Sequence, residues 1–254
     1  HSILPHRTDD IGKNDPEYYR KLNENEQRFI EFKDNDEELN LKVVQLDIIN
    51  KSRKKSNASP VKLDLFASRL ANKMCREAAE NEYIGHWNLA GEEPYLRYAF
   101  AGGYDHVTEN AYGEWSSDNY IASSRLIASM MKTGHAKFMA ERAPDNGHKE
   151  NIIDKSHNYV GIGFYLSGKQ FRYYEEFINR YLEFENIPSV VRAGDPCKIT
   201  VKTNGKSFLY YLIIFRENWP EPLSPAQISK RGSYRDYTNE QYKEMFAWDL
   251  SRYR

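Results

Sequence analysis

The spacing of hydrophobic positions divides this 254-residue chain into a helical part and a strand-rich part. In the first part, apolar residues recur every three or four positions, which is the period of an amphipathic helix. This pattern predicts helices over about residues 39–50, 63–82 and 123–142. The basic run 51-KSRKKSNASP-60 follows the first of them and is interpreted as a solvated loop, with an anionic contact site as the alternative. A shorter helix is expected within residues 16–32.

After the third helix the hydrophobic pattern alternates with a period of two, which indicates β-strands. Residues 158–166 and 170–184 flank the turn-forming run Ser167-Gly168-Lys169, and this arrangement predicts a β-hairpin. Residues 189–217 contain further strand-like segments, with Asn204-Gly205 as a two-residue hairpin turn. These strands are too few for a sandwich core, so we expect them to pack on the helical part or to need additional strands.

The two ends of the chain differ in composition from its middle. Residues 1–40 contain eleven Asp and Glu against six Lys and Arg, and few of these residues are apolar. We interpret the segment as an acidic N-terminal arm that wraps on a partner or on the main domain. Residues 218–237 are rich in proline and serine and are predicted to be mostly loop, followed by a short helix within 239–251. The predicted organisation is an arm (1–40), a main domain (41–184) and a β-rich extension with a tail (185–254).

Composition and charge exclude several classes of protein. The formal net charge of −1 gives no indication of nucleic-acid binding. The longest apolar run, Phe208 to Phe215, is eight residues long and too short to cross a bilayer, so no transmembrane segment is predicted. Cys75 and Cys197 are the only cysteines, too few for a disulfide framework or a zinc finger. Two buried free thiols are expected, with one long-range disulfide as the alternative.

The sequence lacks the signatures of common enzyme classes. Neither G-x-S-x-G nor H-E-x-x-H occurs, which removes the usual marks of serine hydrolases and zinc peptidases. Gly205-Lys206-Ser207 ends like a phosphate-binding loop, but Thr200 stands where that loop requires its first glycine.

The strongest candidate site consists of two histidines and two glutamates, His86, Glu109, Glu141 and His148. The first two are expected in loops after the second helix, and the last two at and just after the end of the third. Two imidazoles and two carboxylates suit zinc or another divalent ion, with water completing an open site. The same groups suit general acid–base chemistry near neutral pH. From spacing alone, a hydrogen-bonded structural role for each histidine is the alternative.

Two short patterns bear on the cellular compartment. Asn50 and Asn57 each begin an N-glycosylation triplet, and the chain starts at His1 rather than Met; both features favour export. The missing disulfide framework favours an intracellular protein or a bacterial-like lineage instead.

Four separated segments carry a resemblance to a known family. They are 47-DIINKSRKKSNASPVKLDLFASRLANKMCREAAENEYIGH-86, 108-TENAYG-113, 139-MAERAPDNGHKENIID-154 and 159-YVGIGFYL-166. Their order and spacing over about residues 41–184 resemble the CAP superfamily, the group of cysteine-rich secretory proteins, insect venom antigens and plant pathogenesis-related proteins. The Gly-His-Lys-Glu-Asn-Ile motif is closer to the bacterial-type members, and the disulfides of the animal and plant members are missing.

The resemblance implies an α+β fold, an α–β–α sandwich with a large central cleft. It places the family's cleft tetrad, able to hold a divalent metal such as zinc, on His86, Glu109, Glu141 and His148. The helix-end motif at Glu141 is Phe-Met-Ala-Glu, without the tryptophan of the family pattern. Residues 84–110 then form the cleft rim, with Gly102 and Gly103 turning the chain back towards Glu109. Asn110 is expected to tie this segment to backbone groups.

These features predict a CAP-domain binding or assembly protein rather than an enzyme. Its cleft is expected to bind a peptide, a glycan or a lipid headgroup, and its arm and tail are expected to contact protein partners. Aromatic residues close to the site in sequence are expected to line the cleft: Tyr95, Tyr98, Tyr104, Tyr112 and Trp115. One alternative is a metal-dependent hydrolase in which His86 and His148 hold the metal and a glutamate activates water. The other is a structural subunit with a vestigial cleft.

Overall fold

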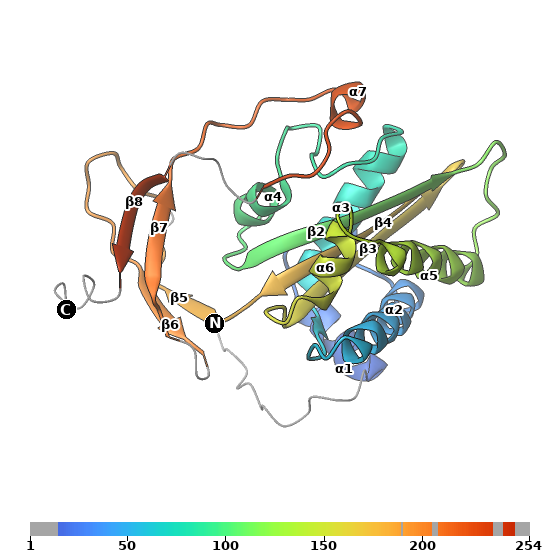
Figure 1. Ribbon diagram of the computed structural model, residues 1–254, viewed down its shortest axis with the longest axis horizontal. Coiled ribbons are helices and arrows are strands. Elements are labelled where there is room, and N and C mark those ends of the chain that lie inside the picture. The colour runs from blue at the N-terminus through green and yellow to red at the C-terminus, as the bar shows by residue number, and fades with distance from the viewer. Residues whose placement is uncertain (1–14, 189, 205–207, 236–240, 247–254) are drawn as a thin grey trace.

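The structure places a four-stranded sheet between two layers of helices (Figure 1). This computed structural model describes residues 15–188, 190–204, 208–235 and 241–246. Its helices are α1 (Pro16–Asn25), the 3-10 helix η1 (Ile30–Phe32), α2 (Asp36–Lys55), α3 (Leu65–Glu80), α4 (Pro94–Phe100), α5 (Ser124–Ala140), α6 (Gly147–Ile153) and α7 (Pro225–Ile228). Its strands are β1 (Lys62–Leu63), β2 (His106–Trp115), β3 (Tyr159–Ser167), β4 (Gln170–Asn179), β5 (Leu182–Glu185), β6 (Thr200–Thr203), β7 (Tyr211–Phe215) and β8 (Gln241–Phe246). The α+β class expected from the sequence is confirmed.

The central sheet has the strand order β1-β3-β4-β2, which makes β2 an edge strand. β1 pairs with β3 in parallel, whereas β3 with β4 and β4 with β2 pair antiparallel. β3 and β4 form the hairpin predicted from the sequence, and Gly168 takes a φ of +55° in its turn. An edge strand has backbone groups on one side that no neighbouring strand binds. The outer side of β2 is therefore open to contacts from other parts of the chain.

Alternation along β3 explains how both helical layers attach to the sheet. The face covered by α2 and α5 receives the buried side chains of Val160, Ile162 and Phe164. On the opposite face, a Cβ atom at Gly163 would lie 2.3 Å from the backbone carbonyl carbon of Ala71 in α3. Gly161 is placed in the same way against Ala67. The two glycines therefore allow the backbone of α3 to lie directly against the strand.

Residues 15–40 pack on the main domain, which was one of the two expectations for the N-terminal arm. The guanidinium of Arg69 in α3 donates to three backbone carbonyls between residues 23 and 28. Lys42 of α2 forms a buried ion pair with Asp34, with 2.7 Å between Nζ and Oδ1. Because α2 begins before residue 40, the expected domain boundary falls inside a helix.

The basic run 51–60 was predicted to be a solvated loop, and this prediction is wrong for its first half. α2 continues to Lys55, and Arg53 within it is fully buried. The guanidinium of Arg53 donates, over 2.6 to 3.0 Å, to the backbone carbonyls of Ser59, Ile152, Asp154 and His157. Burial lowers the pKa of Arg53 to about 10. This arginine joins the end of α2 to the segment that follows α6, a role that a count of charges cannot show.

Beyond β4 the strands pair differently from the prediction. β5 pairs with β6 and β7 pairs with β8, both antiparallel, so the strands on either side of Asn204 are not partners. Residues 205–207 of the expected turn lie outside the described residues. Residues 241–246 form β8 where a helix was predicted, and the remainder of 239–251 is outside the described residues. Strand partners depend on tertiary packing, which a local pattern does not contain.

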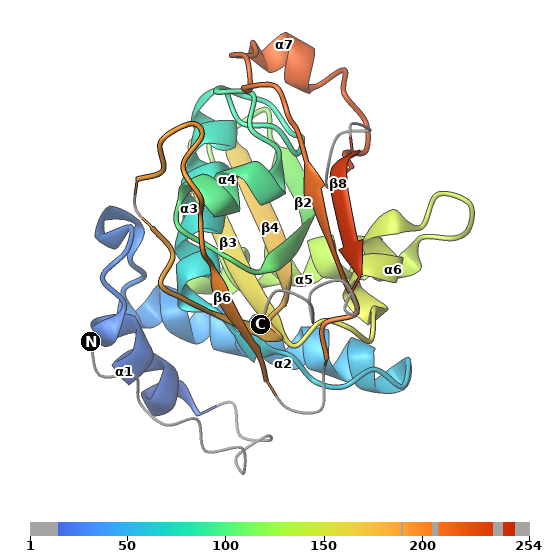
Figure 2. The same cartoon turned by 90° about the vertical axis from the view of Figure 1, so that its left-hand side faces the viewer.

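The segment between β7 and β8 returns to the main domain (Figures 1 and 2). The backbone N–H of Leu223 donates to the carbonyl of Leu89 at 2.9 Å, and Ile228 of α7 is fully buried. Gly91 takes a φ of +81°, and a Cβ there would lie 1.9 Å from the carbonyl oxygen of Glu221. The extension therefore leans on the main domain, as the shortage of strands predicted.

The remaining expectations about the whole chain concern membranes and cysteines. Among the described residues, no helix combines the length and the apolar character needed to cross a membrane. Cys75 is a buried free thiol, as expected, and burial raises its pKa. Cys197 is also free but exposed, so the prediction of two buried thiols is wrong for this residue.

Candidate functional site

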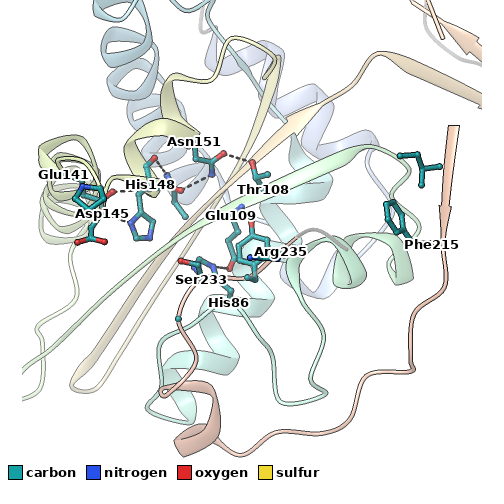
Figure 3. Close-up of a pocket in the computed structure, with 16 residues that line it drawn as sticks. His86, Thr108, Glu109, Glu141, Asp145, His148, Asn151, Phe215, Ser233 and Arg235 are labelled. Carbon is teal, nitrogen blue, oxygen red and sulfur yellow. Dashed lines mark hydrogen bonds and ion pairs between the residues drawn. The ribbon is translucent and has the colours of Figure 1, made fainter. Parts of the chain in front are cut away.

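A cavity of about 1110 Å³ lies at the outer edge of β2 (Figure 3). We call this cavity the cleft. It is lined by His86, Thr108, Glu109, Asn110, Glu141, Pro144, Asp145, Gly147, His148, Asn151, Ile213, Phe215, Gly232, Ser233, Tyr234 and Arg235. The structure thus brings all four candidate site residues to one cavity, from four different parts of the chain.

β2 contributes to the cleft from both of its faces. Successive residues of a strand point to opposite faces, and Glu109 lies across from Glu176 while Asn110 lies across from Glu175. Because β2 is at the edge of the sheet, groups from both faces can reach around it into one cavity. Both faces carry polar residues, so the apolar alternation that reveals a strand is missing. For this reason Glu109 was expected in a loop and is instead in the middle of a strand.

His86 follows α3 and is held against Glu109. Its Nδ1 lies 2.8 Å from Oε1 of Glu109. The second carboxylate oxygen, Oε2, accepts a hydrogen bond from the buried guanidinium of Arg97 in α4. Arg97 also donates to the backbone carbonyl of His86 at 2.5 Å. Charge-assisted bonds of this kind are strong, so the carboxylate is fixed and in turn fixes the imidazole.

Burial determines the charge state of this group. Burial, helped by the charge of Arg97, lowers the pKa of His86 to about 4. The ring is therefore neutral at neutral pH, donates from Nδ1 and keeps its lone pair on Nε2. Burial also raises the pKa of Glu109 to about 7, against the opposing effect of Arg97. Burial and the neighbouring Glu109 raise the pKa of Glu176 well above its ordinary value, because ionising two adjacent buried carboxyls is unfavourable.

His148 and Glu141 form a second pair on the other side of the cleft (Figure 3). Glu141 caps the end of α5, and His148 lies in the first turn of α6. His148 Nδ1 lies 2.5 Å from Oε1 of Glu141. Oε2 of the same carboxylate accepts from the backbone N–H of His148 at 3.0 Å and of Lys149 at 3.3 Å. The His148 ring stacks on Phe138 with 4.6 Å between centroids, which fixes its plane.

The two imidazoles face each other across the cleft, with 6.4 Å between ring centroids. Each Nδ1 is bonded to a carboxylate, and neither Nε2 has a hydrogen-bond partner among the described residues. Both glutamates point at their histidines rather than at a common centre. In the part of the chain that the structure describes, no group of three or more His, Cys, Asp or Glu side chains is arranged to hold a metal ion.

Asn110 connects β2 to α6, and the expectation that it binds backbone groups is confirmed. Its Nδ2 donates to the backbone carbonyl of His148 at 3.1 Å. Its Oδ1 accepts from Asn151 of α6 at 2.9 Å, and Asn151 accepts in turn from Thr108 at 2.6 Å. These bonds set the position of α6, and thereby of His148, relative to the strand that carries Glu109.

The aromatic residues expected to line the cleft all lie elsewhere: Tyr95, Tyr98, Tyr104, Tyr112 and Trp115 are not among its lining residues. α4 carries Tyr98 onto Phe66 of α3, and Tyr95 donates to Glu217 at 2.9 Å. Strand alternation turns Tyr112 under α5, while Tyr104 and Trp115 are exposed. That expectation was based on closeness in sequence. It failed because the side chains of a helix and of a strand point in several directions, so residues close in sequence lie on different faces.

The extension supplies several cleft residues that the sequence did not predict. Ile213 and Phe215 of β7 line it, together with residues 232–235. The backbone N–H of Glu109 donates to the phenolic oxygen of Tyr234 at 2.6 Å, and the Tyr234 ring lies 4.7 Å from that of His86 between centroids. The proline- and serine-rich tail has no periodic pattern, so nothing in the sequence distinguished these residues from ordinary loop.

The two predicted glycosylation sites differ in structure. The side chain of Asn50 donates to the carbonyl of Val61 at 3.0 Å and accepts from its N–H at 2.8 Å. A glycan on this amide would break that pair, so the structure argues against Asn50. Asn57 is exposed in the turn after α2, with a φ of +57°. Glycosylation at Asn57 stays a prediction.

Comparison with known proteins identifies the family of the main domain. The family model "CAP: Cysteine-rich secretory protein family" matches residues 46–177, which include all four candidate site residues. No curated protein sequence matches the chain.

Several solved structures are similar to about half of this chain. An extracellular SCP-domain protein from Bacillus anthracis is 17% identical over 54% of this chain, at a TM-score of 0.41, and the match spans only 39% of that protein. An outer surface protein from Borrelia burgdorferi is 17% identical over 56% of this chain and 93% of its own length, at a TM-score of 0.43. A cysteine-rich secretory protein from Staphylococcus aureus is 13% identical over 56% of this chain and 38% of its own length, at a TM-score of 0.34.

Proposed function

We propose a ligand-binding function for this chain, which belongs to the CAP, or cysteine-rich secretory protein, family. In this proposal the cleft holds a divalent cation, with zinc as the first choice, between Nε2 of His86 and Nε2 of His148. The observation that carries it is the pair of imidazoles facing each other at 6.4 Å between centroids. The cation and the polar cleft walls together would bind a peptide, glycan or lipid headgroup.

The state of both histidines suits a metal ligand. Metal-binding histidines nearly always donate their second N–H to a carboxylate or a carbonyl, which fixes the tautomer and the ring orientation. His86 and His148 each have this partner at Nδ1, in Glu109 and Glu141. The neutral state of His86 at neutral pH also suits a ligand, because a protonated imidazole cannot bind a cation. The two glutamates would then orient the ligands rather than bind the ion themselves.

The same contacts favour binding over metal-dependent hydrolysis. A general base needs a carboxylate oxygen that can accept a proton from water. Both oxygens of Glu109 already accept bonds, from His86 and Arg97. Both oxygens of Glu141 accept as well, from the His148 ring and from two backbone N–H groups. Both glutamates are thus engaged in orienting the histidines, and binding is the function that this geometry supports best.

Calorimetric titration of zinc into the metal-stripped protein tests this proposal. We expect binding in the micromolar range that is lost, or weakened by about a hundredfold, in the His86→Ala/His148→Ala double variant. His106→Ala is the matched control, because His106 is exposed and does not line the cleft. It should bind zinc as the native chain does.

The opposite pattern would contradict the proposal. If the double variant binds zinc as tightly as the native chain, the ion is held elsewhere. If a folded native chain binds no zinc and no other divalent ion, the two His–Glu pairs form only a structural hydrogen-bond network.

A further inference from the structure

One wall of the cleft is built by the chain's own tail. The part involved, residues 232–235, is referred to here as the strap. Gly232, Ser233 and Arg235 are exposed, whereas Tyr234 is half-buried and its ring lies against His86. The contact of the strap with the cleft therefore depends mainly on the side chain of Tyr234.

Tyr234 occupies a position that an extended ligand would use. The N–H of Glu109 lies on the outer side of the edge strand β2, and it donates to the phenolic oxygen of Tyr234 at 2.6 Å. Open edge N–H groups are the donors that bind extended peptides in many recognition domains. The Tyr234 ring also packs against the buried cluster formed by α3 and β4. Tyr234 thus accepts the hydrogen bond of the strand edge with its hydroxyl and packs on apolar residues with its ring.

The anchor of the tail is separate from the strap. Ile228 is fully buried, Leu223 is hydrogen-bonded to Leu89, and Arg231 lies over the Trp87 ring at 4.8 Å. At Gly232, between the anchor and Tyr234, a Cβ would meet nothing within 4 Å. Glycine restricts its backbone less than other residues do, and the chain between the anchor and Tyr234 is held by no side-chain contact of residue 232.

We propose that the strap is a resident occupant of the cleft, and that the external partner is an extended peptide whose tyrosine takes the place of Tyr234. The carboxylates of Glu141 and Asp145 line the same cleft, and Arg235 follows Tyr234 in the strap. This charge pattern favours a partner peptide with a basic residue after its tyrosine. The inference rests on the proposed function, because it takes the cleft as a ligand site and names the class of ligand.

Filling the vacated position with a peptide tests this inference. Tyr234→Ala removes the ring and the phenol but leaves the Ile228 anchor. The probe is the acetylated, amidated peptide Arg-Gly-Ser-Tyr-Arg, the sequence of residues 231–235, followed by the amide resonance of Glu109 in ¹H–¹⁵N spectra. We expect the variant to bind the peptide about tenfold or more tightly than the native chain does. The peptide should also move the Glu109 resonance back towards its native position.

Two controls make the result specific. Tyr210→Ala, which changes an exposed tyrosine of the same extension outside the cleft lining, should bind the peptide no better than the native chain. The same peptide with alanine in place of tyrosine should bind no better to Tyr234→Ala than to the native chain. If Tyr234→Ala does not fold, Tyr234→Phe keeps the ring and should speed hydrogen exchange at the Glu109 amide by about tenfold.

Equal peptide binding by the native chain and the folded Tyr234→Ala variant, or no binding by that variant, overturns the inference. Unchanged exchange at Glu109 in Tyr234→Phe also overturns it. A zinc titration of the same samples separates the two proposals. Zinc binding without peptide binding removes the strap inference alone, whereas peptide binding without zinc binding removes the proposed metal site alone.

Discussion

At the scale of single residues, burial rather than proximity decides what the site groups can do. His86 and Glu109 are in contact, yet the pKa of the first is lowered to about 4 and the pKa of the second is raised to about 7. Both shifts favour the neutral form, because burial penalises charge on either group. The buried Arg97 then supplies the positive charge against which the carboxylate is held.

The first prediction concerns the titration of His86. Its ring should stay neutral down to about pH 5 and titrate with a midpoint near pH 4, whereas an unperturbed histidine titrates near pH 6.5. Ring C–H and ¹⁵N chemical shifts followed against pH, assigned with His86→Gln, measure this directly. The ¹⁵N shifts should also show the proton on Nδ1. A midpoint near pH 6.5 would contradict the burial of His86 beside Arg97.

The overall stability of the protein is a poorer measure of these shifts. As pH falls from 6.5 towards 4, the unfolded chain protonates this histidine before the folded chain does. Protonation of His86 therefore lowers the free energy of unfolding over that range. Glu109 has the opposite sign: the folded chain takes up its proton between about pH 7 and 4.5, before the unfolded chain does, and this adds stability. Because the two effects oppose each other, the individual resonances are the proper observable.

The sequence identifies the titratable residues of the candidate site but not the role of each. His86, Glu109, Glu141 and His148 were selected by residue type and by resemblance, and the structure brings all of them to one cleft. Their division into two pairs depends on where the carboxylates point, which neither spacing nor composition contains. Glu176 was overlooked because it lies in a strand that reads as ordinary hairpin, and its importance follows only from the register with β2.

At the scale of elements, the cleft lies where it does because β2 is an edge strand. The glycines of β3 allow α3 to pack closely on the sheet. Periodicity located α3, α5 and the β3–β4 hairpin because their buried faces are continuous and apolar. It missed β2 because that strand carries polar residues on both faces. It also missed the partners of β7 and β8, because pairing across a long connection leaves no local signal.

The second prediction concerns the contact between β3 and α3. Gly163→Ala should lower the free energy of unfolding by about 1–3 kcal/mol or more, because the added methyl group meets the backbone of α3 and neither element can move freely. Urea denaturation of both proteins measures the difference. Gly147→Ala is the matched control, since a Cβ at Gly147 meets nothing within 4 Å, and its effect should stay within about 0.5 kcal/mol. Equal effects of the two changes would contradict the packing of α3 on β3.

At the scale of the whole molecule, the extension forms part of the candidate cleft. The family match ends at residue 177, whereas Ile213, Phe215 and Tyr234 line the cleft from beyond it. Gly91 leaves space for the carbonyl of Glu221, so the main domain is shaped to receive this tail. The domain organisation predicted from sequence separated the two parts, because composition changes sharply between them while their contacts lie far apart along the chain.

The central claim is that His86 and His148 hold one divalent ion between them. The most direct measurement is an anomalous difference map at the zinc absorption edge, from crystals of the native protein soaked with zinc. We expect a peak between the Nε2 atoms of the two histidines, with Glu109 and Glu141 still bonded to the Nδ1 atoms. Zinc peaks elsewhere with none in the cleft, or a peak ligated by the glutamates with the histidines turned away, would contradict it.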